Sequence, residues 1–220
     1  MYDFDWDVVI DYSPLFIKGV GMTVQLTTIG IIFGMILGLI LAFMRLSKNP
    51  LFNWPATIYL NIFRGTPLFV QLLVIHLAAI PMIFGTSQGP FFSGSVALAL
   101  NSAAYISEIF RAGIKSIDKG QMEAARSLGM THWMAMREII LPQAVKRMIP
   151  PFGNEFIMLL KDSSLVAVIA VHDLTQAGRM VMAATFKPWE AYLPVAVLYL
   201  MLTLPLTYLV AYLERRLETK

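Results

Sequence analysis

The stretch Glu123-Ala124-Ala125-Arg126-Ser127-Leu128-Gly129 lies near the middle of this chain, and Ile139-Ile140-Leu141-Pro142 follows it after nine residues. Both belong to residues 115–147, a charged segment between strongly apolar ones. A polar segment of this size has little to do in a small apolar protein unless another protein docks on it. We therefore interpret residues 115–147 as a docking loop for a partner.

Helix signals divide this docking loop into two expected helical pieces. Asp118, with Gln121 three residues later, is typical of a capping box at a helix start. Gly129 is placed to end that helix, and Thr131 can cap the next turn. The docking loop is thus predicted to be a compact helical unit.

The composition indicates an integral membrane protein. Hydrophobic residues make up 57% of the 220 residues and charged residues only 14%, against about 25% charged residues in ordinary soluble domains. A membrane-crossing helix needs about 20 apolar residues, so the chain is long enough for about five crossings and their loops. We expect one all-α transmembrane domain over residues 1–220. The absence of cysteine excludes disulfides and thiolate metal sites.

Five apolar regions are expected to cross the bilayer as helices. They cover about 15–44, 54–84, 95–113, 149–171 and 189–212. In the first region a ridge of small residues recurs every four positions, which lets another helix approach closely. The ridge consists of Gly30, Gly34, Gly38 and Ala42.

The fourth apolar region is expected to be irregular. Pro142 and Pro150-Pro151 are predicted to interrupt the chain before it. Lys161-Asp162-Ser163-Ser164 then breaks its apolar run, so we interpret it as a discontinuous helix. Residues 172–188 are expected to be a connection on the far side of the membrane.

The distribution of lysine and arginine predicts the orientation of the chain. One set of loops holds only Lys18, Arg179 and Lys187, whereas the other holds Arg45, Lys48, Lys115, Lys119, Arg126, Arg137, Lys146, Arg147, Arg215, Arg216 and Lys220. Because cytoplasmic loops carry the excess of basic residues, the richer set is predicted to be cytoplasmic. The amino terminus is then outside, the carboxyl terminus inside, and the number of crossings odd. These charges orient the protein and do not indicate a nucleic-acid partner.

The motif spacing resembles a known pattern. Glu123-Ala124-Ala125, Gly129, Ile139 and Leu141-Pro142 together resemble the cytoplasmic docking loop of permease subunits in binding-protein-dependent ABC importers. Three further stretches are similar to the polar amino-acid permeases of that superfamily: Arg64-Gly65-Thr66-Pro67-Leu68, Tyr105-Ile106-Ser107-Glu108-Ile109-Phe110-Arg111 and Leu160-Lys161-Asp162-Ser163-Ser164-Leu165. The resemblance covers about residues 20–213 and implies a type I importer permease fold.

The resemblance implies the role and the partners of the chain. It implies a multi-pass subunit of a bacterial or archaeal cell membrane that forms the path for an amino acid. Two ATPase subunits, a second permease copy or close paralogue and an extracytoplasmic solute-binding protein would complete the transporter. The ATPase would contact Glu123, Ala124, Ala125 and Gly129. The chain has no Gly-x-x-x-x-Gly-Lys-Ser/Thr motif, so it is expected to hold no cofactor itself, with ATP and magnesium on the ATPase.

Polar residues inside the apolar regions are the candidate solute ligands. An ionisable side chain at the bilayer centre costs roughly 2.5 to 3.5 kcal/mol, so each needs a partner or a wet cavity. A zwitterionic amino acid needs a cation or backbone amides for its carboxylate, and carboxylates or carbonyls for its ammonium. The first candidates are Asn101, Tyr105, Glu155 and Asp162, and Ser102 and Thr66 rank after them. The excess of acidic candidates favours a basic amino acid such as arginine, lysine or histidine.

Three alternatives remain open at this point. Arg64, Glu108, Arg111 and Glu155 can instead pair between helices and only hold the bundle together. An ion-gradient-driven secondary transporter or channel explains the polar intramembrane residues but leaves residues 115–147 without a task. An intramembrane enzyme ranks last, because no catalytic pair is visible and the three histidines have no metal-binding spacing.

Overall fold

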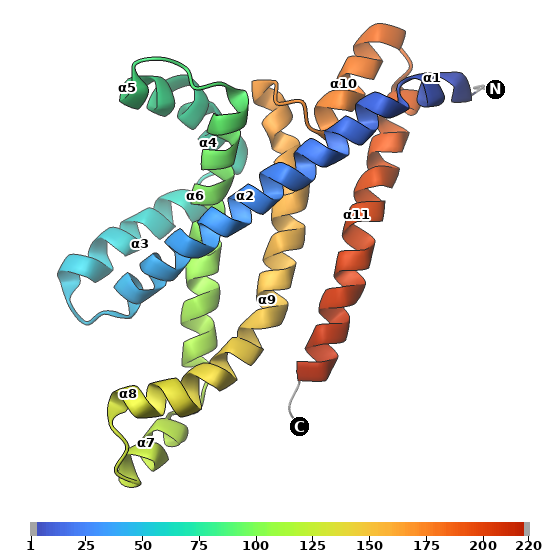
Figure 1. Ribbon diagram of the computed structural model, residues 1–220. Helices are drawn as coiled ribbons and strands as arrows, with labels where there is room; N and C mark the ends of the chain where they lie inside the picture. Colours follow the sequence, from blue (N-terminus) through green and yellow to red (C-terminus); the bar gives the residue numbers. More distant parts are fainter. Residues whose placement is uncertain (1–3, 218–220) are drawn as a thin grey trace.

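A computed structural model describes residues 4–217, which form helices and no strand (Figure 1). Residues 1–3 and 218–220, including the basic residue Lys220, lie outside the described part. The α-helices are α1 (Trp6–Asp11), α2 (Ser13–Leu46), α3 (Pro50–Gly65), α4 (Leu68–Val74), α5 (Ile80–Phe84), α6 (Pro90–Lys115), α7 (Lys119–Ser127), α8 (His132–Ala135), α9 (Leu141–Asp162), α10 (Leu174–Thr185) and α11 (Pro188–Leu217). Two π-helical turns, η1 (Ile75–Ala79) and η2 (Met136–Ile140), and one 3-10 helix, η3 (Ser163–Ile169), complete the set.

The close approach of α2 to α6 organises the bundle, and it occurs at the predicted ridge of small residues. All four ridge residues are buried. A methyl group added to Gly34 would lie 3.1 Å from Ser102 Cβ, and one added to Gly38 would lie 2.7 Å from Ile106 Cγ2. At these two positions α6 lies so close that an added methyl group would crowd it, which confirms the predicted ridge.

The second apolar region is not one helix, and this prediction was wrong. α3 and the α4–α5 segment meet at an angle of 108°. Thr66 and Pro67 have extended backbones. At Thr66 this follows from the proline ring, which disfavours the helical conformation of the residue before it. Gln71 Nε2 donates to the carbonyl oxygens of Phe63 at 2.8 Å and Thr66 at 3.0 Å. The Gln71 amide thus donates hydrogen bonds to carbonyl groups that lose their helical donors at the break.

The prolines between 142 and 151 do not interrupt the chain, which corrects a second prediction. Helix runs without a gap from α8 through η2 and α9 into η3. Pro142 falls in the first turn of α9, directly after the wider π turn η2, where its missing N–H is tolerated. Pro150 and Pro151 lie inside α9, which curves along its length in Figure 1. The expected irregularity near residue 163 is present as a change from α to 3-10 geometry.

The segment predicted as a connection, residues 172–188, contains a helix that we did not predict. α10 is capped by Asp173, whose carboxylate accepts from the backbone N–H groups of Thr175 at 3.0 Å and Gln176 at 2.9 Å. Leu174 N donates to Thr23 Oγ1 of α2 at 3.1 Å, and the Tyr199 hydroxyl of α11 lies 3.4 Å from Asp173 Oδ2. These contacts fix α10 across the ends of α2 and α11.

Replacing Asp173 by alanine is expected to loosen α10. Loss of an N-cap side chain costs about 1 to 2 kcal/mol of stability, and thermal unfolding of the purified protein should show a lower midpoint. Asp173→Ser retains a capping oxygen and should lie close to the wild-type midpoint. Equal midpoints for Asp173→Ala and the wild type would contradict this role of the cap.

By length and apolar content, two helices of the described part qualify as membrane spans, α2 and α11, and the bent α3–α5 pair is a third candidate. α6 and α9 are not among these candidates, and both carry buried polar side chains, such as Asn101 and Ser102 of α6 and Glu155 of α9. Figure 1 places α1 and α10 at one end of the bundle and α7, α8 and the end of α11 at the other. This is the arrangement expected from the charge distribution, while the five crossings and their orientation stay predictions.

Candidate functional site

A groove of about 410 Å³ is lined by three elements that are separate in sequence. Arg64 comes from the end of α3, Tyr105 and Glu108 from α6, and Arg147 and Glu155 from α9. Tyr105 and Glu108 are three residues apart on α6, and Arg147 and Glu155 are eight apart on α9, so each pair shares one helix face. The groove therefore combines two cations and two carboxylates.

The charges on the α6 side of the groove are held in place by contacts. The Arg64 guanidinium lies 5.7 Å from the centre of the Tyr105 ring, within the range of a cation–π interaction. Arg111 donates through Nε to Glu108 Oε2 at 2.9 Å and through Nη2 to Oε1. Glu108 and Arg111 thus form one of the pairs that the sequence left open as a structural alternative, and Arg64 is the cation of α3 that lines the groove.

Glu155 is the buried carboxylate of the groove. Its exposed fraction is 6%, and its Oε1 accepts a hydrogen bond from Ser102 Oγ of α6 at 3.0 Å. A buried carboxylate is costly unless it is paired or hydrogen-bonded. The Ser102 hydroxyl is a neutral donor and only weakly stabilises a buried carboxylate. A cationic group entering the groove would therefore be bound favourably by Glu155.

Asn101 and Thr66 lie apart from the groove. Asn101 Nδ2 donates to Gln71 Oε1 at 2.9 Å, and Gln71 Nε2 in turn donates to Thr66 Oγ1 at 2.9 Å. Both candidates thus belong to the hydrogen-bonded network that supports the break between α3 and α4. Asp162 lies at the end of α9, seven residues beyond Glu155, and does not line the groove. The structure brings together Tyr105, Ser102 and Glu155 from the predicted set.

Arg147 is a lining residue that the sequence interpretation placed in the polar docking loop. Its Nη1 donates to the carbonyl oxygen of Ser116 at the end of α6. Arg147, Pro151 and Glu155 follow each other at four-residue spacing, which is the signal of one helix face. The signal was missed because Pro150 and Pro151 were expected to break that helix.

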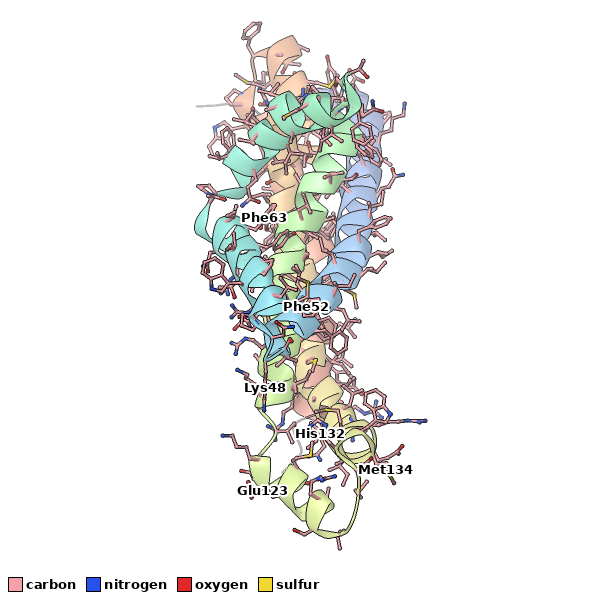
Figure 2. All side chains as sticks on the ribbon, turned by 90° about the vertical axis from the view of Figure 1, so that its left-hand side faces the viewer. Lys48, Phe52, Phe63, Glu123, His132 and Met134 are labelled. Atoms are coloured by element: carbon pink, nitrogen blue, oxygen red, sulfur yellow. The ribbon has the colours of Figure 1, made fainter. Side chains whose placement is uncertain are left out.

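The docking loop forms the end of the molecule opposite α10, and Figure 2 shows Glu123 near this end. Asp118 Oδ1 accepts from Gly120 N at 2.7 Å and Thr131 Oγ1 accepts from Met134 N at 3.2 Å, so both predicted caps are confirmed. Gly129 has φ +83° and turns the chain between α7 and α8, as predicted. The second piece is the beginning of the long α8–α9 helix and not a separate helix.

The two adjacent alanines of α7, Ala124 and Ala125, differ in their exposure. Glu123 and Ala124 are exposed, whereas Ala125 has an exposed fraction of 1%. Ala125 therefore packs inside the loop, and we had expected it on the docking face beside Ala124. The small residue allows α7 to lie close to η2.

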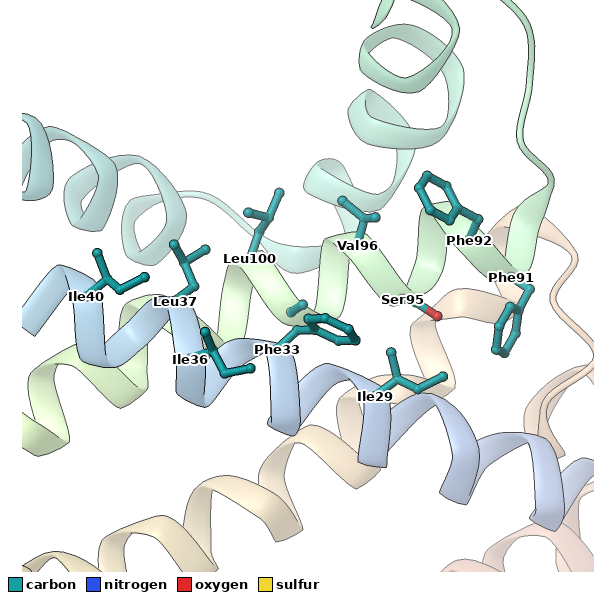
Figure 3. A pocket seen from close by; sticks show the side chains of 11 residues that line it. Ile29, Phe33, Ile36, Leu37, Ile40, Phe91, Phe92, Ser95, Val96 and Leu100 are labelled. Carbon is teal, nitrogen blue, oxygen red and sulfur yellow. The ribbon is translucent and has the colours of Figure 1, made fainter. Parts of the chain in front are cut away.

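A second cavity, of about 480 Å³, lies between α2 and α6 and is apolar (Figure 3). Phe33 and Leu37 of α2 face Val96 and Leu100 of α6 across it, and its lining includes one hydroxyl, that of Ser95. A zwitterion would lose its hydration there without compensation. The polar groove is therefore the candidate solute site.

Comparison with known proteins identifies the family of this chain. The family described as binding-protein-dependent transport system inner membrane component matches residues 30–219. The chain belongs to this family. It is therefore a membrane component of an importer, located in the inner membrane, and not an enzyme. The transport system also requires a solute-binding protein and an ATPase.

Individual members of this family agree with that assignment over nearly the whole chain. The glutamine transport system permease protein GlnP of Escherichia coli K12 is 39% identical, and the arginine transport system permease protein ArtQ of Bacillus subtilis is 38% identical. Each comparison covers 98% of this chain and 98% of the relative. A chain from the crystal structure of an amino acid ABC transporter with histidines is 44% identical, with a TM-score of 0.91 over 98% of this chain and 100% of that chain.

A more distant structure supports the fold alone. A chain of the MetNI methionine ABC transporter in an inward-facing conformation is 22% identical, with a TM-score of 0.77 over 93% of this chain. The two structures, at 44% and 22% sequence identity, thus confirm the predicted importer permease fold.

Proposed function

We propose that this chain forms the translocation path of an ATP-driven importer of polar amino acids. The names of the relatives, which concern glutamine and arginine, support an amino-acid substrate. The observation that carries the proposal is the groove in which Arg64 and Arg147 face Glu108 and Glu155. Charges of both signs in one groove suit a solute that itself carries both signs.

Within the groove, the two ends of the solute would bind to different helices. The α-carboxylate would lie toward Arg64, which is exposed and stacked on Tyr105. The α-ammonium, or a basic side chain, would lie toward Glu155, whose second oxygen remains available beside the bond to Ser102. We retain the preference for a basic amino acid on this ground, because Glu155 is the most buried charge of the groove.

The complete transporter is proposed to contain two copies of this chain, or this chain and a close paralogue, with two ATPase subunits. One copy is thin-walled, and its groove opens at the surface, so a second copy is needed to enclose a path. Glu123, Ala124 and Gly129 would contact the ATPase, with Ala125 supporting them from inside. ATP and magnesium would bind to the ATPase, and this chain would hold no cofactor of its own.

Glu155→Gln should weaken solute binding. It removes the buried charge and keeps the size of the side chain, and a hydrogen bond to a charged group contributes about 1.5 to 3 kcal/mol. We expect the concentration of a basic amino acid that gives half-maximal uptake in proteoliposomes to rise by roughly ten- to a hundredfold.

Glu214→Gln is the matched control, because Glu214 is exposed near the end of α11. It should leave uptake unchanged. Ser102→Ala removes the hydrogen bond to the Glu155 carboxylate but keeps its charge. It should therefore have a smaller effect than Glu155→Gln. If Glu155→Gln transports basic amino acids with wild-type affinity, Glu155 is not a solute ligand.

A further inference from the structure

Pro67 leaves the carbonyl oxygen of Phe63 without a helical donor. In an α-helix this oxygen would accept from the backbone N–H four residues later, and Pro67 has none. Two side-chain amides take its place. Gln71 Nε2 donates to the Phe63 oxygen at 2.8 Å, and Asn101 Nδ2 of α6 lies 3.5 Å from the same oxygen. An amide of α4 and an amide of α6 thus meet at one carbonyl group near the end of α3.

The two amides are also bonded to each other, and we call Gln71 and Asn101 the amide pair. Asn101 Nδ2 donates to Gln71 Oε1 at 2.9 Å. The exposed fractions are 7% for Gln71 and 6% for Asn101, and neither residue lines the groove. The amide pair is therefore a buried connection between α4, α6 and the end of α3.

The amide pair acts directly on the backbone of Arg64. The carbonyl group of Phe63 belongs to the peptide whose nitrogen begins Arg64, and a peptide group is planar and rigid. Fixing its oxygen therefore fixes the point from which the Arg64 side chain leaves the backbone. On α6, Asn101 precedes Tyr105 by one helical turn on the same face, and the Arg64 guanidinium lies 5.7 Å from the centre of the Tyr105 ring. The same face of α6 thus holds both ends of Arg64.

The Arg64 guanidinium is placed in the groove without an acidic partner. Arg64 forms no ion pair with another residue of the described part, 4–217, and Glu108 of the groove is bonded to Arg111. An exposed side chain of this length loses conformational freedom when it binds a ligand. A fixed backbone and a stacked ring reduce that loss, because the side chain is ordered beforehand.

We propose that Gln71 is a positioning residue for solute recognition, which holds the Arg64 guanidinium where the α-carboxylate of the amino acid binds. The inference rests on the proposed function, which assigns that carboxylate to Arg64. Gln71 acts through the peptide between Phe63 and Arg64 and does not touch the solute. Its loss should therefore weaken the binding of solutes that carry a carboxylate and leave other solutes unaffected. A general loosening of the bundle would weaken the binding of both.

The test measures the binding of two labelled probes to the complex of permease and ATPase in lipid nanodiscs, without the solute-binding protein. Arginine carries an α-carboxylate, and agmatine is the same molecule without it. Gln71→Met removes the amide donors and keeps a flexible side chain of similar length. We expect the dissociation constant of arginine to rise at least tenfold, because the charge-assisted bond to Arg64 is misplaced. The dissociation constant of agmatine should change less than twofold.

A double-mutant cycle shows whether Gln71 acts through Arg64. Substitutions that affect one shared interaction have non-additive effects. Arg64→Ala alone should raise the dissociation constant of arginine at least tenfold, and adding Gln71→Met should raise it less than twofold further. Two effects that multiply would overturn the proposal, because Gln71 would then act independently of Arg64.

Tyr59→Phe is the matched control, because it removes another hydrogen bond between α3 and α6. Tyr59 Oη donates to the Leu100 carbonyl oxygen at 2.7 Å, and its loss should change the binding of both probes less than twofold. Thermal unfolding checks the fold of each variant. If Gln71→Met does not fold, Gln71→Asn replaces it, since it keeps a polar group at this buried position. Its amide is one methylene group shorter, so it should fall short of the Phe63 oxygen and weaken arginine binding selectively.

The outcomes separate this inference from the proposed function. Unchanged arginine binding in the folded Gln71 variant, or equal weakening of arginine and agmatine binding, would overturn the positioning role. If Arg64→Ala binds arginine as tightly as the wild type does, the proposed contact between the carboxylate and Arg64 fails instead.

Discussion

Gly129→Val is expected to reduce ATP-driven uptake at least tenfold while the permease remains folded in the membrane. Gly129 has φ +83°, and a methyl group added to it would meet no atom within 4 Å. The substitution therefore acts through the backbone alone. The left-handed conformation costs roughly 1 to 2 kcal/mol for ordinary residues, and more for a β-branched one. The turn between α7 and α8 would change, and Glu123 would be displaced.

Gly129→Asn is the control for this prediction, because asparagine tolerates the left-handed region. It adds a larger polar side chain at the same exposed position and should retain most of the uptake. Uptake and ATP hydrolysis are measured together in proteoliposomes, and thermal unfolding checks the fold. If valine and asparagine have equal effects, the backbone conformation of Gly129 is not what couples the two subunits.

Gly38→Val should prevent the bundle from forming. Its added Cβ would lie 2.7 Å from Ile106 Cγ2, 2.9 Å from Ile106 Cβ and 3.0 Å from the Ala103 carbonyl oxygen. The backbone oxygen cannot move without displacing α6, so the two helices would separate. Overpacking of this kind costs about 1 to 3 kcal/mol or more. We expect little folded protein in membranes and early aggregation in detergent.

Gly21→Val is the matched control on the same helix. Gly21 is exposed, and a methyl group added there would meet nothing within 4 Å. It should accumulate to wild-type levels. Ile106→Ala should partly rescue Gly38→Ala, because it removes the side-chain atoms that the new methyl group would meet. Failure of this rescue, or equal loss with Gly21→Val, would show that the contact between α2 and α6 is not the cause.

Sequence patterns predicted the features that depend on local backbone chemistry. The caps at Asp118 and Thr131 and the turn at Gly129 each follow from one residue type at one position, and the small-residue ridge follows from its four-residue spacing. The pairing of Glu108 with Arg111 likewise follows from spacing on one helix. Such features need no knowledge of what the segment packs against.

Features that depend on neighbouring elements were not predictable in the same way. Pro67 breaks its helix, whereas Pro150 and Pro151 do not. A proline in a bundle is tolerated when neighbouring groups satisfy the freed carbonyls, and the sequence does not show those neighbours. At Thr66-Pro67 the break is stabilised by Gln71, a residue that we had placed on the same helix as Arg64.

The candidate site was likewise predictable only in part. Polar residues in apolar regions gave six candidates, and the structure brings together three of them, Tyr105, Ser102 and Glu155. Asn101 was a reasonable candidate for the same reason, but its amide is bonded to Gln71. Arg147 was not among the candidates, because only polar residues within the apolar regions were considered, yet α9 carries it to the groove.

Uptake by reconstituted proteoliposomes tests the central claim, that a separate ATPase acting on the docking loop drives transport through this chain. Liposomes containing the permease, the ATPase and the solute-binding protein should accumulate a basic amino acid when ATP is supplied to the ATPase, and Gly129→Val should reduce this accumulation at least tenfold. Liposomes with the permease alone should show no uptake under a sodium or proton gradient. Gradient-driven uptake by the permease alone, unaffected by Gly129→Val, would contradict the account.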